Sequence, residues 1–209
     1  MYKCIIFDVD GTLIDTRDAL SKCYYEFIEE EKLGKPMDEI MNSFFGLKTK
    51  DCFNILGIQG DCIAEMQRWL EIYQKYECRI KLFDDVETVL QKLREEYIYL
   101  GIVTSRTREE LFEDRHFKPI AHLFDNVVSC DDTLLHKPHP EPLLKFLEKS
   151  GYVQRECIYI GDTIFDLECA QKANVDFALA CWGTTLTNDM SIKRIMKVED
   201  ILSLVNTLQ

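Results

Sequence analysis

Three short apolar segments, each followed at once by polar residues, constrain the fold more than any other feature of this sequence. They span residues 4–7, 98–103 and 157–160. Their length and their content of Ile, Val, Tyr and Phe are typical of buried strands. Amphipathic helical patterns lie between the second and third segments, and another at residues 201–208 predicts a C-terminal helix. This alternation predicts an α/β fold with a doubly wound parallel sheet.

Helical patterns alone fill the chain after the first strand. The longest apolar stripe is Ile63, Met66, Leu70 and Tyr73, and shorter stripes lie within residues 37–44 and 52–56. We therefore expect a small α-helical cap domain over residues 15–80, inserted into a core domain of residues 1–14 and 81–209. Insertions of this kind in α/β domains often cover an active site.

Two acidic residues directly follow the first strand. Asp8 and Asp10 are one residue apart, so the period of an extended chain points both side chains to the same side. Ligands of open parallel sheets bind at the carboxyl ends of the strands. Two clustered carboxylates repel each other unless a proton or a cation lies between them. A single acid at this position could simply form a polar turn that caps the next helix. Two acids directly after a core strand instead favour a catalytic or metal-binding role.

The other two strands also end in polar groups. Thr104 and Ser105 follow the second strand, and Asp162 follows the third, with Asp166 one helical turn further on. If the strands are adjacent and parallel, these groups meet at one edge of the sheet. Asp162 and Asp8 would then form an oxygen-only cation site, which suits Mg2+. Together with a nearby lysine, such a set describes phosphoryl transfer.

Lysines supply the positive charge that this chemistry needs. Lys137, before Pro138, is placed to hold an anion or a nucleophile, although an ordinary solvated lysine is the alternative. Lys48 and Lys50 follow Gly46 in the helical insertion, where a loop could meet a substrate. Charged pairs on loops are usually only solvated, so the sequence leaves their role open.

The motifs resemble those of the haloacid dehalogenase (HAD) superfamily. Residues 8–13 read DVDGTL and match the first motif, DxDGTL. Thr104 matches the second motif, Lys137 the third, and residues 161–166 (GDTIFD) the fourth, GDxxxD. All four occur in the family's order along essentially the whole chain. The helical insertion resembles the cap of the phosphoglycolate phosphatase-like branch.

The resemblance implies catalytic roles for the first-motif acids. Asp8 would attack phosphorus and become an aspartyl phosphate. Asp10 would protonate the leaving oxygen and then activate the water that hydrolyses the intermediate. The resemblance also implies that the Asp8 carboxylate, the Asp10 carbonyl and Asp162 bind Mg2+. Asp10 argues against the dehalogenases of this superfamily, which lack an acid at that position.

The remaining motifs would hold the phosphate and the nucleophile. The resemblance implies that Thr104 and the Ser105 amide bind phosphate oxygens. Lys137 would stabilise Asp8 and the transferred group, and Asp166 would orient Lys137 and the ligands of the metal.

These roles predict Mg2+-dependent hydrolysis of a small phosphate monoester, as in phosphoglycolate phosphatase-like enzymes. A sugar phosphomutase similar to β-phosphoglucomutase is the alternative within enzymes, because its first motif is the same. A module that is phosphorylated on Asp8 without turnover is the alternative outside them. Phosphoglycolate, pyrophosphate, nucleotides and sugar phosphates all stay open as substrates.

Composition narrows the partners and the compartment. A net charge of −12 argues against a nucleic-acid partner. The sequence has no apolar window long enough for a membrane helix and no visible signal peptide. Nine cysteines without a CxxC pair suggest reduced thiols in a cytoplasmic protein. We expect a small phosphorylated metabolite as partner, no membrane, and either a monomer or a homodimer.

Overall fold

A six-stranded parallel sheet forms the centre of the protein. The computed structural model describes residues 2–33, 44–184, 186 and 192–205. The strands lie in the order β5-β4-β1-β6-β7-β8, and every neighbouring pair is parallel. Their bounds are β1 (Cys4–Phe7), β4 (Tyr99–Val103), β5 (Asn126–Val128), β6 (Cys157–Gly161), β7 (Asp176–Ala180) and β8 (Lys193–Ile195). The predicted doubly wound α/β fold is confirmed.

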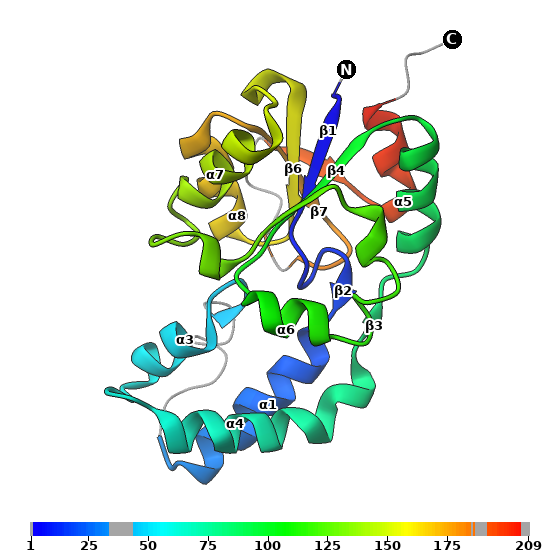
Figure 1. Ribbon diagram of the computed structural model, residues 1–209. Coiled ribbons are helices and arrows are strands. Elements are labelled where there is room, and N and C mark those ends of the chain that lie inside the picture. Colours follow the sequence, from blue (N-terminus) through cyan, green and yellow to red (C-terminus); the bar gives the residue numbers. More distant parts are fainter. Residues whose placement is uncertain (1, 34–43, 185, 187–191, 206–209) are drawn as a thin grey trace.

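Helices cover both faces of this sheet. The helices α5 (Val86–Glu95) and α7 (Glu141–Ser150) lie on opposite sides of it (Figure 1). The side chains of β1 alternate accordingly: Ile5 and Phe7 join the core cluster that contains α5, and Cys4 and Ile6 join the one that contains α7. The helix α8 (Ile164–Ala173) packs beside α7, and a 3-10 helix, η5 (Val198–Leu204), packs on α5.

A separate layer of helices lies below the sheet in the view of Figure 1. It consists of α1 (Arg17–Glu30), α3 (Thr49–Leu56) and α4 (Ile63–Tyr76). These helices share a buried cluster of their own in which Phe27, Phe53 and Trp69 are in aromatic contact. A two-stranded antiparallel ladder joins the chain's passages into and out of this layer, β2 (Ile14–Asp15) and β3 (Lys81–Leu82).

Shorter helices complete the described part of the chain. They are α6 (Arg108–Glu113), η1 (Glu77–Arg79), η2 (Ala121–Leu123), η3 (Cys130–Asp132) and η4 (Gln154–Glu156). None of the described helices is both long enough and apolar enough to cross a membrane.

Two details differ from the sequence predictions, and one lies beyond what the structure describes. The described part of the apolar stripe at residues 201–208 lies in the 3-10 helix η5 and the turn that follows it, rather than in an α-helix. The strand β8 was not predicted, because it has only three residues and two of them, Lys193 and Arg194, are charged. Charged side chains are typical of the edge of a sheet, where β8 lies. Most of the predicted stripe at residues 37–44 falls outside the described residues.

The strand order brings the predicted functional positions together. The central strand β1 pairs with β4 on one side and β6 on the other. Phe7, its last residue, is in register with Ile102 of β4 and Ile160 of β6. The residues that follow these three strands therefore gather at one edge of the sheet, which faces the layer of α1, α3 and α4 (Figure 1).

Candidate active site

A buried lysine joins two of the predicted acids. The Lys137 Nζ lies 2.8 Å from Asp8 Oδ1 and 2.7 Å from Asp166 Oδ1. It also donates to the hydroxyl of Tyr159, which itself lies 2.8 Å from Asp166 Oδ1. All four residues are buried. Lys137 is thus held at the end of β1. It is not the solvated surface lysine that was the alternative interpretation of the sequence.

Three acids of the site are buried close together. Asp8, Asp162 and Asp166 are all buried, and their carboxylates lie within 4.8 Å of one another. Burial, opposed by the Lys137 charge, raises the pKa of Asp8 to about 7. Burial and then the Asp166 and Asp8 charges raise the pKa of Asp162 well above its usual range. Without a further cation, Asp8 and Asp162 are shifted towards their protonated forms, and a bound cation would favour their ionised forms.

The free oxygens of the cluster decide which acids fit a metal. Both oxygens of Asp166 already accept hydrogen bonds, Oδ1 from Lys137 and Tyr159, Oδ2 from the backbone and hydroxyl of Thr163. Asp166 is therefore suited to hold Lys137 rather than a metal. Asp8 accepts a hydrogen bond on Oδ1 alone, and each oxygen of Asp162 accepts only one, from Thr12 at 3.5 Å and from Arg17 at 3.1 Å, so both acids keep lone pairs for a metal. A pair of buried carboxylates fits Mg2+, which takes oxygen ligands and usually only one or two of them carboxylates.

A glycine allows the first-motif loop to approach Asp162. Gly11 has a φ of +75°, and a Cβ at this position would lie 2.2 Å from Asp162 Oδ2. The loop that carries Asp10 thus passes directly over Asp162. This closeness is compatible with the predicted contribution of the Asp10 carbonyl to a metal site.

The Asp10 carboxylate has a partner that the sequence did not reveal. Arg106 donates to both of its oxygens, from Nε and Nη2, each at 2.7 Å. The same guanidinium donates from Nη1 to Asp114 at 2.6 Å. Asp10 can still accept a proton through its remaining lone pairs, but donating one from a bonded oxygen requires one of these contacts to open. Arg106 immediately follows Ser105. Its position just after a predicted strand was the one sequence feature that could have indicated a role in the site.

Thr104 and Ser105 lie at the end of β4, as predicted, but in different environments. Thr104 is buried, and its hydroxyl accepts a hydrogen bond from the backbone of Arg106. The Ser105 hydroxyl lines a cleft and donates to the carbonyl of Gly46, in the helical layer. Ser105 thus contacts the site and the helical layer together.

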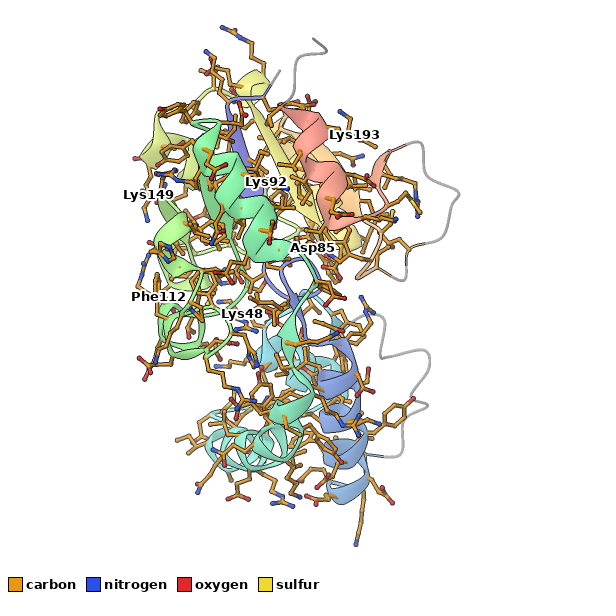
Figure 2. All side chains as sticks on the ribbon, turned by 90° about the vertical axis from the view of Figure 1, so that its right-hand side faces the viewer. Lys48, Asp85, Lys92, Phe112, Lys149 and Lys193 are labelled. Carbon is orange, nitrogen blue, oxygen red and sulfur yellow. The ribbon has the colours of Figure 1, made fainter. Side chains whose placement is uncertain are left out.

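The cleft lies between the sheet edge and the helical layer and has a volume of about 480 Å3. Asp8, Asp10 and Lys137 line its inner end. Lys48 and Lys50 line it from the helical layer. Figure 2 shows Lys48 at the level where the two parts of the molecule meet. The structure therefore brings the proposed nucleophile and both loop lysines to one cavity.

Two further contacts join the two parts of the protein. The Lys48 Nζ lies 2.6 Å from Nε2 of His136, the residue before Lys137. Burial and then the Lys48 charge lower the pKa of His136, which suits a neutral ring accepting from the ammonium. Arg17, in the first turn of α1, donates to Asp162 and to the carbonyl of Gly183. Arg17 was missed, because nothing in the sequence indicates which charged residue of a helix turns toward a distant strand end.

Comparison with known proteins identifies the family. Residues 5–180 match the family model described as haloacid dehalogenase-like hydrolase. The pyrophosphatase PpaX of Oceanobacillus iheyensis is 27% identical over 212 residues, covering 97% of this chain and 96% of that protein. The pyrophosphatase PpaX of Bacillus velezensis is 29% identical over 180 residues, covering 85% and 82%.

A solved structure agrees over nearly the whole chain. A Lactobacillus plantarum protein described as "putative phosphoglycolate phosphatase" is 31% identical, with a TM-score of 0.83, and the match covers 98% of this chain and 99% of that one. The family model spans most of the chain, including β1, β4 and β6. The chain therefore belongs to the haloacid dehalogenase-like hydrolases and is an enzyme of that family.

Proposed function

We propose that this enzyme hydrolyses a small phosphate monoester through an aspartyl phosphate formed on Asp8. The observation that carries the proposal is the position of Asp8, at the end of β1 on the floor of the cleft, with the Lys137 ammonium 2.8 Å from its Oδ1. A carboxylate nucleophile held beside a cation suits attack on phosphorus. Relatives named as phosphatases support the same class of reaction.

The neighbouring residues would divide the remaining work. Asp10 would protonate the leaving oxygen and then take a proton from the attacking water. Thr104 and Ser105 would hold phosphate oxygens, while Lys137 would stabilise the charge on the transferred group. Asp166 would act as a positioning residue, because its carboxylate holds the Lys137 ammonium.

We propose Mg2+ as the cofactor, held by the Asp8 carboxylate, the Asp10 carbonyl and Asp162. When bound, it would neutralise charge on the phosphoryl oxygens. The closeness of the buried Asp8 and Asp162 carboxyls, whose pKa values burial raises, supports this assignment. Family members in general use this metal.

Residues 15–80 would form the cap, with residues 1–14 and 81–209 as the core. Its own buried cluster and the two connecting strands β2 and β3 support this division. Nine free thiols fit a cytoplasmic protein. The partner would be a small phosphorylated metabolite.

Phosphate release tests the proposal directly. Purified enzyme should release phosphate from simple phosphate monoesters with Mg2+, lose this activity when the metal is chelated, and regain it when Mg2+ is restored. Asp8→Asn removes the nucleophile and should lower kcat by roughly a thousandfold or more. Asp84→Asn is the matched control, because Asp84 is 92% exposed and far from the cleft lining, and its activity should stay within about twofold. Turnover that survives Asp8→Asn would refute the mechanism.

Pyrophosphate hydrolysis is the second candidate, because relatives covering most of the chain are named pyrophosphatases. The same assay with pyrophosphate compares the two. A phosphomutase would instead move the phosphoryl group to a second hydroxyl without releasing phosphate. A module without turnover would release one equivalent of leaving group in a single burst.

A further inference from the structure

Two helices present matching rows of side chains to the cleft. Thr16, Leu20 and Tyr24 line it from the start of α1 at intervals of four residues. From α4 come Met66, Trp69, Leu70 and Tyr73, which share one helical face. We name the apolar members of these rows the apolar wall (Leu20, Tyr24, Met66, Trp69, Leu70 and Tyr73). A continuous apolar surface therefore faces the catalytic carboxylates across the cavity.

Part of this wall is open to solvent rather than buried in the helical core. Leu70 is 50% exposed, while Leu20, Met66 and Tyr73 are half-buried. Tyr73 lines the cleft together with Asp10, Arg106 and Asp114. Burial, opposed by the Arg106 charge, raises the pKa of its hydroxyl. The wall thus begins where the leaving group of a bound phosphate ester would emerge.

The charges of the cleft do not suit a second phosphoryl group. Among the described residues, seven acidic and four basic side chains line it. Two of the basic ones are already paired with carboxylates, Lys137 with Asp8 and Asp166, Arg106 with Asp10 and Asp114. The other two, Lys48 and Lys50, lie among seven acids, so a polyanion such as pyrophosphate would meet a lining with an excess of negative charge beyond its first phosphoryl group.

From this arrangement we infer that the substrate is a monophosphate ester whose leaving group is apolar and uncharged, and that the apolar wall binds this group. The inference rests on the proposed phosphatase function and adds the chemical class of the leaving group. A cavity of about 480 Å3 is in the range that takes a small organic ligand. Transfer of an apolar group from water to such a wall is favourable and needs no polar partner.

Benzyl phosphate and ethyl phosphate test the inference, because their alcohols are leaving groups of similar reactivity that differ in apolar size. We expect kcat/KM to be at least about tenfold higher for benzyl phosphate, the scale that apolar contacts of one or more methylenes provide. Pyrophosphate and phosphoglycolate, with charged leaving groups, should be poorer than benzyl phosphate. Equal or lower kcat/KM for benzyl phosphate, or a preference for pyrophosphate, would overturn the inference.

Leu70→Gln tests the wall itself. The substitution places an amide on the half-exposed surface position and should reduce the benzyl-to-ethyl ratio of kcat/KM to within about threefold. Ile63→Gln is the matched control on the same helix, since Ile63 is 68% exposed and does not line the cleft, and it should keep the wild-type ratio. A ratio that is unchanged in Leu70→Gln, or reduced equally in Ile63→Gln, would contradict the role of the wall.

A binding measurement separates this inference from the proposed reaction. Calorimetry with Mg2+ should find benzylphosphonate, which cannot be hydrolysed in the same way, bound about tenfold more tightly than ethylphosphonate. Tight benzylphosphonate binding without turnover of any ester would refute the proposed function but support the role of the apolar wall in binding. Turnover of both esters, with no preference for the benzyl compound in either assay, would refute the role of the apolar wall but support the proposed phosphatase function.

Discussion

Lys137 holds together a cluster of buried acids that would otherwise repel one another. Its side chain is 1% exposed, and its ammonium lies within 2.8 Å of both Asp8 and Asp166. Although burial lowers it, these two carboxylates raise the pKa of Lys137, so the ammonium stays charged. A buried charge that loses its partner is strongly destabilising. Lys137 is therefore expected to matter for stability as well as for catalysis.

Replacing this lysine tests that expectation. Lys137→Met should lower the free energy of unfolding by about 3–5 kcal/mol, because two buried carboxylates lose their counter-charge. Urea unfolding in metal-free buffer at pH 7 measures the loss. Lys145→Met is the control, because Lys145 forms an exposed pair with Glu148 and its loss should cost no more than about 0.5 kcal/mol. A loss below about 1 kcal/mol for Lys137→Met would contradict the account.

Arg106 is expected to position Asp10 for proton transfer. A lysine keeps the charge but cannot donate in a planar fork to both Asp10 oxygens while holding Asp114. Arg106→Lys should therefore lower kcat by about tenfold to a hundredfold and change KM by less than about threefold. Steady-state kinetics separates the two parameters. Arg108→Lys is the control, since Arg108 lies outside the cleft lining, and a rise in KM alone for Arg106→Lys would indicate substrate binding instead.

The sequence located the reacting groups better than the groups that support them. Asp8 and Asp162 could be placed at one edge because each directly follows a buried strand, and Lys137 could be assigned through its match to the third family motif. Arg106 and Tyr159 could not be assigned, because their partners are 96 and 7 residues away and depend on how strands and loops pack. Charge pairing between distant segments is a property of the folded chain and leaves no local pattern.

At the scale of elements, Asp132 ties the end of β5 to two helices. It accepts from the backbone and hydroxyl of Ser129, from Lys149 of α7 and from Arg108 of α6. Burial opposes these contacts, but the hydrogen bonds from Lys149 and Ser129 outweigh it and lower the pKa of Asp132 to about 2. A carboxyl with a lowered pKa stabilises the fold above its unfolded pKa, near 4.

Asp132→Asn should reveal this contribution through its pH dependence. The free energy of unfolding should fall by about 1–2 kcal/mol at pH 7. The difference from wild type should shrink as the pH falls from about 4 towards 2, because the wild-type carboxyl then becomes protonated. Urea unfolding at several pH values measures it, with the exposed Asp84→Asn as control. A difference that stays constant down to pH 2.5 would exclude an ionised carboxylate as its source.

The sequence signal for a strand is strongest where burial is complete and weakest where it is partial. The segments β1, β4 and β6 lie in the middle of the sheet, so their sequences are continuously apolar. The edge strand β8 and the two-residue strands β2 and β3 carry charged side chains and resemble loops. Strand order is a further property that the sequence left open, because it depends on which helices pack together.

At the scale of the whole molecule, several polar contacts between described residues join the helical layer to the sheet edge. They include the β2–β3 ladder, the Ser105–Gly46 hydrogen bond, the Lys48–His136 contact and the hydrogen bonds of Arg17. Two of these four, the Ser105–Gly46 hydrogen bond and the Lys48–His136 contact, involve residues of the cleft. A ligand in the cleft would therefore act on the contacts that set how the two parts meet, as expected of a cap over an active site.

The net charge of −12 and the acid-rich cleft make a prediction for the whole enzyme. A dianionic phosphate ester approaches a surface of the same sign, so salt should screen repulsion rather than attraction. Raising the ionic strength from about 0.01 M to 0.15 M shortens the Debye length from about 30 Å to about 8 Å. At constant free Mg2+, kcat/KM for ethyl phosphate should then rise roughly two- to fivefold.

Initial rates in sodium chloride and in tetramethylammonium chloride test this prediction and separate screening from ion binding. The two salts should act alike, and kcat should change little, because the bound substrate is shielded from bulk ions. A fall in kcat/KM with salt would mean that the field of Lys48, Lys50 and Lys137 dominates the approach despite the acids around them. That result would also favour polyanions such as pyrophosphate as substrates, because the cleft would then attract negative charge.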